Sequence, residues 1–341
     1  MKTPSKYKQK YKNSHKRLDK RSKTSKSKSS KKKSSKHKTH HKTHHKTHHK
    51  THHHNNSKNY HNHTDKLNCS PNPDNKNKSY TCYSDTSLEK MKKFWNIRHP
   101  DNKISSDKPK EIWEQLKDNM SQSCKRESCW LRSKFMEGNL DSELLNYTFA
   151  PSAPKEWNAK PNEWLSSLDI EGVMKQYENY YKCFEFLGPS PIDYDHHKLY
   201  GECVWEELCN LNISEQMKRN INKIGIILNT HPHNKGGEHW ISMFVNIKKR
   251  QIVYFDSNGN KPPPQVSKLM NEIKNQGKQL GIDFKLYANE IEHQKTDSEC
   301  GMYCLYFIIE MLKDNELDYF LKNEIDDSKV FKLRKKYFNV I

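Results

Sequence analysis

The first 66 residues carry the whole net charge of this 341-residue chain, and they limit what can fold. They hold 22 Lys and Arg residues against two acidic residues, whereas residues 67–341 hold 39 of each sign. A segment with almost no apolar side chains cannot bury enough surface to offset the entropy that its chain would lose on folding. We therefore expect residues 1–66 to be disordered, and the fold to lie within the electrically neutral remainder.

The composition of this tail favours binding to polyanions. Residues 2–38 are rich in Lys and Ser, and residues 39–54 repeat the sequence Thr-His-His-Lys. Lysine-dense segments bind nucleic acid by releasing counterions from phosphates, without reading the base sequence. We expect the tail to bind nucleic acid or another polyanion non-specifically. The alternative is a polycation that only keeps the protein soluble.

The rest of the composition indicates the cellular compartment of the protein and the redox state of its cysteines. Only 32% of residues are hydrophobic, no apolar run approaches the ~20 residues that a bilayer requires, and no apolar stretch follows the basic N-terminus. We expect neither a membrane segment nor secretion, so the nine cysteines should be reduced thiols. We also expect no metal and no cofactor. A zinc site at Cys124 and Cys129 is a weak alternative, because the sequence has no Cys-x-x-Cys pair.

The remaining 275 residues divide at clusters of proline and polar residues. Residues 67–86 are typical of a linker, 87–150 of a helical extension, and 151–341 of a larger domain that begins at a proline cluster. Within that domain the apolar patterns predict helices at about 163–186, 202–211 and 267–279, strands at 223–228, 239–247, 251–255 and 284–287, and a buried helix at 301–313. This order of elements predicts an α+β fold.

Polar residues lie at the ends of these predicted elements. His239 begins one strand and Asp256 ends the next, so pairing of the two strands as a hairpin would make them neighbours. Cys300 begins the buried helix, where the positive end of the helix dipole favours the thiolate form. Gln294 is placed to donate an N–H to an oxyanion, and Gly301 would let a substrate backbone approach. Each residue alone is ordinary; their order and positions together predict nucleophilic catalysis.

At these residues the sequence resembles a clan of cysteine proteases that contains the ubiquitin-like (SUMO) proteases and the adenovirus protease. The resemblance covers residues 221–312 and reaches about residue 163 through the sequence WLSSLDI. It implies a small mixed sheet flanked by helices. It also implies that His239 is the general base, Asp256 its orienting partner, Gln294 the oxyanion donor and Cys300 the nucleophile. Trp240 and Trp164 would line the substrate channel.

Within the clan, the sequence is most similar to polyprotein-processing proteases of large cytoplasmic DNA viruses, of the African swine fever virus type. These proteases carry an extra helical N-terminal region, as residues 87–150 would be here. Glu299 stands where SUMO proteases usually carry Asp, and we expect it not to touch the chemistry. We expect His293, beside Gln294, to be an exposed loop histidine.

The resemblance implies a cysteine endopeptidase that cleaves after small, Gly-Gly-type residues. Its substrates would be precursor polypeptides of a giant virus, processed during virion maturation, in the virion and in the viral factory of the host cytoplasm. A second hypothesis is a deubiquitinase or SUMO protease that acts on host conjugates. A third is a non-enzymatic basic packaging or scaffold protein, in which the protease-like domain is only a fold.

Overall fold

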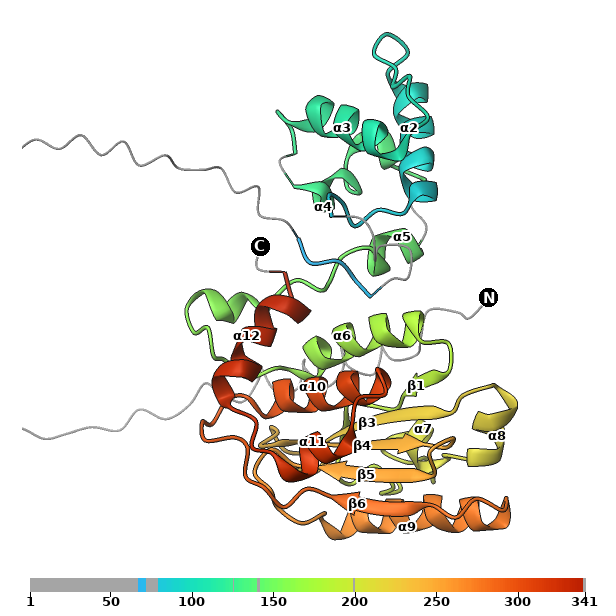
Figure 1. Ribbon diagram of the computed structural model, residues 1–341, viewed down its shortest axis with the longest axis vertical. Helices are drawn as coiled ribbons and strands as arrows, with labels where there is room; N and C mark the ends of the chain where they lie inside the picture. Colours follow the sequence, from blue (N-terminus) through green and yellow to red (C-terminus); the bar gives the residue numbers. More distant parts are fainter. Residues whose placement is uncertain (1–66, 72–78, 125, 140–141, 199, 340–341) are drawn as a thin grey trace, which may run out of the picture. The chain divides into compact units, whose positions relative to one another are not determined.

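The computed structural model describes residues 67–341, apart from 72–78, 125, 140–141, 199 and 340–341 (Figure 1). The expected disorder of residues 1–66 therefore concerns a segment outside the described residues. No helix in the described part is long and apolar enough to span a membrane.

A six-stranded mixed sheet forms the centre of the larger domain, with the order β1-β3-β4-β5-β6 and with β2 paired to β3. Its longer strands, β3, β4 and β5, are antiparallel neighbours, whereas β1, β2 and β6 add to them in parallel. The strands are β1 Phe184–Phe186, β2 Ser190–Pro191, β3 Lys223–Asn229, β4 Trp240–Asn246, β5 Gln251–Phe255 and β6 Lys285–Ala288. The predicted α+β class and the mixed sheet are confirmed.

The central strands are apolar on both faces because both faces are covered. On one face, Phe244 and Phe255 pack with residues of helices α6 (Ser167–Tyr180) and α10 (Cys300–Leu312). On the other face, Met243 and Tyr254 pack with helices α8 (Ile213–Lys218) and α9 (Pro264–Gln279). Strands buried on both sides appear in sequence as continuous apolar runs rather than alternating ones, as in residues 223–228.

Helix α10 is the most deeply buried helix of this domain. Twelve of its 13 residues are buried, and the Phe307 ring stacks on Phe255 of β5 with centroids 4.7 Å apart. Such a helix is held by packing on all sides, so its first residue, Cys300, has a fixed place beside the sheet. The predicted bounds of the helix, 301–313, are shifted by one residue from the observed ones.

The helices outside this core include several that the sequence patterns did not indicate. The predicted helix at 163–186 ends at Tyr180 and is followed by strand β1, which pairs with β3. The predicted helix at 202–211 is only the short α7, Glu206–Cys209. Helices α11 (Leu317–Lys322) and α12 (Asp327–Tyr337) follow α10 and close over the α10 face of the sheet (Figure 1).

The N-terminal helices have an apolar cluster of their own, which includes Met91, Leu116 and Trp130. These elements are α2 Asp85–Arg98, α3 Pro109–Met120, α4 Glu127–Trp130, η2 Lys134–Met136 and α5 Ser142–Tyr147. Asn339, just beyond α12, accepts from the backbone N–H of Asn68 and donates to the carbonyl of Ala150. One amide side chain thus connects the start, the middle and the end of the described chain.

The expectation that every cysteine is a reduced thiol is wrong for three pairs. Disulfides join residues that lie 13, 5 and 6 positions apart in the sequence, namely Cys69–Cys82, Cys124–Cys129 and Cys203–Cys209. Each pair has Cα atoms between 5.1 and 6.3 Å apart, which is a separation that a disulfide can span. Cys183, Cys300 and Cys304 are free.

Candidate active site

The hairpin of β4 and β5 brings His239 and Asp256 together. The two strands pair antiparallel with Ser242 opposite Phe255, so the residue before β4 lies beside the residue after β5. The Nε2 atom of His239 is 2.6 Å from Oδ1 of Asp256, and the Asp256 side chain is only 3% exposed. The sequence prediction that strand pairing makes them neighbours is therefore correct.

Further hydrogen bonds to its carboxylate and to its backbone hold Asp256 in place. Its carboxylate accepts from the backbone N–H of Asn258 at 2.9 Å and from the side chain of Asn260 at 3.1 Å. The buried amide of Asn289 accepts from the backbone N–H of Asp256 and donates to its carbonyl. With both its oxygens and its backbone engaged, the carboxylate can fix the orientation of the imidazole ring.

The charges around His239 favour its protonated form. Burial by itself disfavours the imidazolium, but the hydrogen bonds to Asp256 and Cys300, and the charges of these two groups, outweigh it and raise the pKa of His239 to about 9. Burial likewise opposes ionisation of Asp256, yet the pairing with His239 keeps the pKa of this carboxyl below its usual value. At neutral pH the site therefore holds an imidazolium between a carboxylate and a sulfur.

The sulfur belongs to Cys300, the first residue of α10. Its side chain is free and buried, and no acidic residue occupies the first turn of the helix after it. The positive end of the helix dipole at this position stabilises an anionic sulfur. A thiolate that faces an imidazolium is the activated nucleophile of cysteine-dependent acyl transfer.

Gln294 is held by the turn that follows β5. Its amide oxygen accepts from the Ser257 hydroxyl at 2.8 Å, and its amide nitrogen donates to the carbonyl of Thr296. An amide nitrogen has two hydrogens, and the second has no acceptor among the described residues. Gly259 allows the turn to lie close to the backbone of Ile291, since a Cβ at residue 259 would come within 2.7 Å of it.

The residues predicted to contact substrate lie next to Cys300. The indole N–H of Trp240 donates to the carbonyl of Leu165 at 3.1 Å. A Cβ on Gly301 would meet Leu165 at 3.1 Å and Trp240 at 3.3 Å. Trp164, the neighbour of Leu165, is 41% exposed. Gly301 therefore lets Leu165 and Trp240 pack closely against the helix, a reason for the glycine that the sequence did not reveal.

The burial of His293 differs from the prediction. His293 is fully buried rather than exposed, its Nδ1 accepts from the backbone N–H of Ile325 at 3.2 Å, and its ring stacks on Phe255. Burial lowers the pKa of His293, so it is a neutral histidine of the core. Ser257 and Asn289 were not predicted to support the site. For Ser257 the turn Asp-Ser-Asn-Gly was a signal, because side chains in such turns cap backbone groups.

A buried thiol at a helix N-terminus that faces an ion-paired histidine on a mixed sheet defines a cysteine protease. Comparison with known sequences identifies the family. The sequence profile of the Ulp1 protease family, C-terminal catalytic domain, matches residues 214–341. A protein of Acanthamoeba polyphaga mimivirus that carries the name of a thiol protease is 33% identical over 240 residues, or 69% of this chain and 76% of that protein. This chain belongs to the Ulp1 protease family.

Two further comparisons extend the likeness beyond the profile. A cysteine protease of African swine fever virus is 26% identical over 261 residues, which cover 72% of this chain and 94% of that protein. The crystal structure of the African swine fever virus protease superposes with a TM-score of 0.59 at 22% identity, over 80% of this chain and 96% of that one. The shared fold thus includes the N-terminal helices as well as the sheet.

We predict an alkaline limit to activity that depends on Asp256. Because the pKa of His239 is raised to about 9, the imidazolium persists below that pH and is lost above it. The value of kcat/KM, which reports free-enzyme ionisations, should fall as the pH rises through about 9. Asp256→Asn removes the stabilising charge and should shift this fall to lower pH. If kcat/KM of Asp256→Asn fell at the same pH as that of the wild type, the ion pair between Asp256 and His239 would not be the cause of the raised pKa.

We predict that Gln294→Ala lowers kcat by about 100- to 1000-fold, the usual effect of removing one oxyanion donor. The KM for a peptide substrate should change little, because the amide contacts charge that develops only in the transition state. Ser257→Ala removes only the hydrogen bond to the amide oxygen of Gln294, so it should lower kcat by less than Gln294→Ala does. A large rise in KM with normal kcat would instead assign Gln294 to substrate binding.

Proposed function

We propose that this protease cleaves precursor polypeptides after small, Gly-Gly-type residues. The proposal is supported by Leu165 and Trp240, which pack so closely against α10 directly after Cys300 that a Cβ on Gly301 would meet them at 3.1 and 3.3 Å. A substrate residue with a large side chain next to the scissile bond would meet these two residues. A glycine presents only backbone and can lie in a narrow slot.

The reaction follows from the arrangement of the four polar residues. The Cys300 thiolate attacks the carbonyl carbon of the scissile bond, and the oxyanion is stabilised by the Gln294 amide and the backbone N–H of Cys300. The His239 imidazolium gives its proton to the leaving amine, and the C–N bond breaks to leave a thioester. Neutral His239 then takes a proton from water, whose oxygen attacks the carbonyl carbon of the thioester. The C–S bond breaks, the acyl product leaves as a carboxylic acid, and the Cys300 thiolate and the His239 imidazolium are restored.

We propose a viral precursor as the substrate, with processing in the virion and in the viral factory of the host cytoplasm. Support comes from the likeness to viral proteins that carry the names of thiol and cysteine proteases, over about seven tenths of the chain. The polycationic tail fits this setting, since it would retain the protease on nucleic acid inside a forming particle. No separate cofactor is needed for the chemistry described.

A ubiquitin-like modifier is the second candidate substrate. It is favoured by two exposed apolar side chains near the start of α6, Trp164 at 41% and Leu168 at 51% exposure. Apolar side chains exposed close to a catalytic centre can contact a folded partner. The third hypothesis, a non-enzymatic scaffold, is disfavoured because His239, Asp256 and the free Cys300 lie together as hydrolysis requires.

We predict that Cys300→Ala and His239→Ala each abolish cleavage of a short Gly-Gly-X peptide, because nucleophile and base act as a unit. The same peptide with Leu in place of the second Gly should be a poor substrate of the wild type. A fluorogenic conjugate of a folded modifier, assayed in parallel, separates the two candidate substrates. Cleavage of the conjugate about 100-fold faster than the peptide would favour the modifier. Unchanged cleavage by Cys300→Ala would refute the nucleophile.

We predict that deleting residues 1–66 leaves peptide cleavage intact and removes salt-sensitive binding to DNA. Binding by the full chain should weaken steeply between low and physiological salt, because counterion release drives it. It should strengthen as the pH falls through ~6.5, where the 13 tail histidines begin to be protonated. Titration with labelled duplex DNA at several salt concentrations measures both trends. Unchanged DNA binding after deletion would place the docking surface elsewhere.

A further inference from the structure

Arg334, on the last helix of the described chain, lies buried beside the active site although none of the chemistry above uses it. Its side chain is 3% exposed and so is that of its partner Glu299. The guanidinium donates from Nε at 3.0 Å and from Nη2 at 2.8 Å to the two carboxylate oxygens, and it lies over the Trp157 ring at 4.4 Å. This two-pronged pairing fits the planar guanidinium and no other cationic side chain.

The remaining donors of Arg334 reach two segments that border the nucleophile. Nη2 donates to the carbonyl of Ser298 at 3.3 Å, and Nη1 donates to the carbonyl of Glu163 at 2.8 Å. Ser298 and Glu299 directly precede Cys300 in the chain. Glu163 directly precedes Trp164 and Leu165, the segment that packs on Gly301 and Trp240. One side chain therefore connects the approach to the thiol with the wall of the substrate slot.

Arg334 also controls the charge next to the sulfur. Glu299 is a buried carboxylate one residue before Cys300, and an uncompensated negative charge there would oppose a thiolate. The guanidinium neutralises it. Buried ion pairs seldom add stability over apolar residues of similar volume, so the presence of this pair beside the nucleophile points to a role in geometry and charge.

We propose that Arg334 is a positioning residue for the hydrolytic reaction. It places Cys300 through Glu299 and Ser298, and it places Trp164 and Leu165 through the carbonyl of Glu163. The inference rests on the assignment of Cys300 as the nucleophile. It also revises the expectation for Glu299, which does not touch the reacting atoms but fixes the residue that does.

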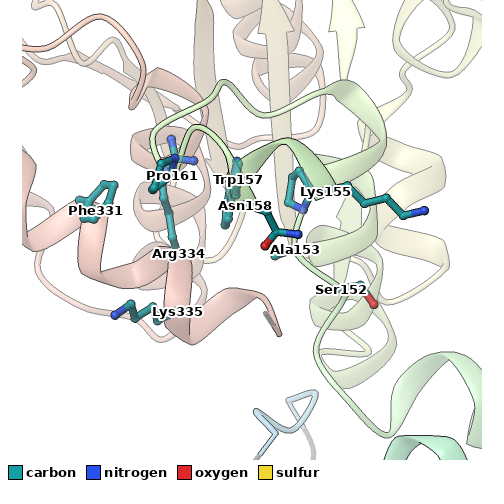
Figure 2. A pocket seen from close by; sticks show the side chains of 10 residues that line it. Ser152, Ala153, Lys155, Trp157, Asn158, Pro161, Phe331, Arg334 and Lys335 are labelled. Atoms are coloured by element: carbon teal, nitrogen blue, oxygen red, sulfur yellow. The ribbon is translucent and has the colours of Figure 1, made fainter. Parts of the chain in front are cut away.

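The surroundings of Arg334 allow a direct test. Figure 2 shows its side chain on the wall of a pocket of about 500 Å³ that it shares with Trp157, Phe331, Lys155 and Lys335. Truncation to alanine would leave a guanidinium-sized hole that opens into this pocket. A small guanidinium compound added to the solution could then occupy the place of the lost side chain, opposite the intact carboxylate of Glu299.

The experiment measures kcat and KM for a Gly-Gly-X peptide, normalised to the folded fraction of each variant. We expect Arg334→Ala to lower kcat by about 100-fold, the cost of misplacing a reacting group by about 1 Å, and to raise KM. Glu299→Gln should lower kcat with KM within about two-fold, because it releases the Cys300 side only. Millimolar methylguanidinium should restore part of the kcat of Arg334→Ala, whereas ethylammonium, an ion of equal charge without the planar fork, should not.

Two controls separate positioning from folding. Arg219→Ala removes an arginine that makes a similar two-pronged pair with Glu185 at the surface, and it should leave both constants unchanged with or without methylguanidinium. The double variant Glu299→Met/Arg334→Met removes both buried charges, so it should fold even where a single variant does not. The double variant should still show the reduced kcat, because it lacks the hydrogen bonds from Arg334 to the carbonyls of Glu163 and Ser298.

A normal kcat in the folded double variant would overturn the proposal and leave Arg334 a purely structural residue. So would the absence of rescue, or equal rescue by ethylammonium, in a folded Arg334→Ala protein. Failure of the proposed function gives a different result: the wild type would leave the Gly-Gly-X peptide uncleaved, or cleavage would persist in Cys300→Ala, whatever the behaviour of the Arg334 variants.

Discussion

The packing of helix α10 against one face of the sheet determines where the reactive sulfur lies. Aromatic contacts such as that between Phe307 and Phe255 hold the helix to β5, the strand that directly precedes Asp256. Because protein interiors are packed as densely as organic crystals, the helix cannot slide along the sheet without opening cavities. The thiol at its first residue, the imidazole before β4 and the carboxylate after β5 are therefore fixed on one rigid body. The catalytic geometry is a consequence of the core.

Two ion pairs involve the neighbours of Cys300 in this frame, and three of their four side chains are buried. His239 and Asp256 set the charge that faces the sulfur, while Arg334 neutralises the carboxylate of Glu299, the residue before Cys300. Removing one member of a buried pair typically costs about 3–5 kcal/mol, whereas the intact pair adds little net stability. These pairs therefore specify one arrangement of the site more than they stabilise the fold. Their aromatic and amide neighbours, Trp157 and Asn289, complete the hydrogen bonding and stacking that burial of charge requires.

The same framework explains how one chemistry can serve different substrates within one fold. His239, Asp256 and Cys300 lie at the ends of β4, β5 and α10, which share a single core. The residues that would meet the substrate on its acyl side, Trp164 and Leu165, belong to the segment before α6. Hydrogen bonds from Trp240, Arg334 and Trp157 tie this segment to the domain, and Leu165 packs into the same core as Cys300. Sequence changes at the exposed Trp164 can alter the slot without disturbing the packing around the nucleophile.

The sequence by itself determined the local elements of this protein and the order of its reactive residues. Apolar runs, turns and an all-apolar helix are local patterns, so the β4–β5 hairpin, the neighbouring positions of His239 and Asp256, and the place of Cys300 could be predicted. The charge of the first 66 residues is equally a property of sequence alone. Strand β1 was mistaken for the end of a helix because its three residues carry no period of their own.

Only the tertiary structure decided the interactions between residues far apart in the chain. Arg334 meets Glu163 across 171 positions, and Asn339 meets Asn68 across 271. No local pattern marks such partners, because a charged residue on a polar helix is usually exposed and only packing can enclose it. The burial of His293, the support of Gln294 by Ser257 and the disulfide pairings have the same origin. Residue type limits what each side chain can do, but the folded neighbours determine which of these possibilities is realised.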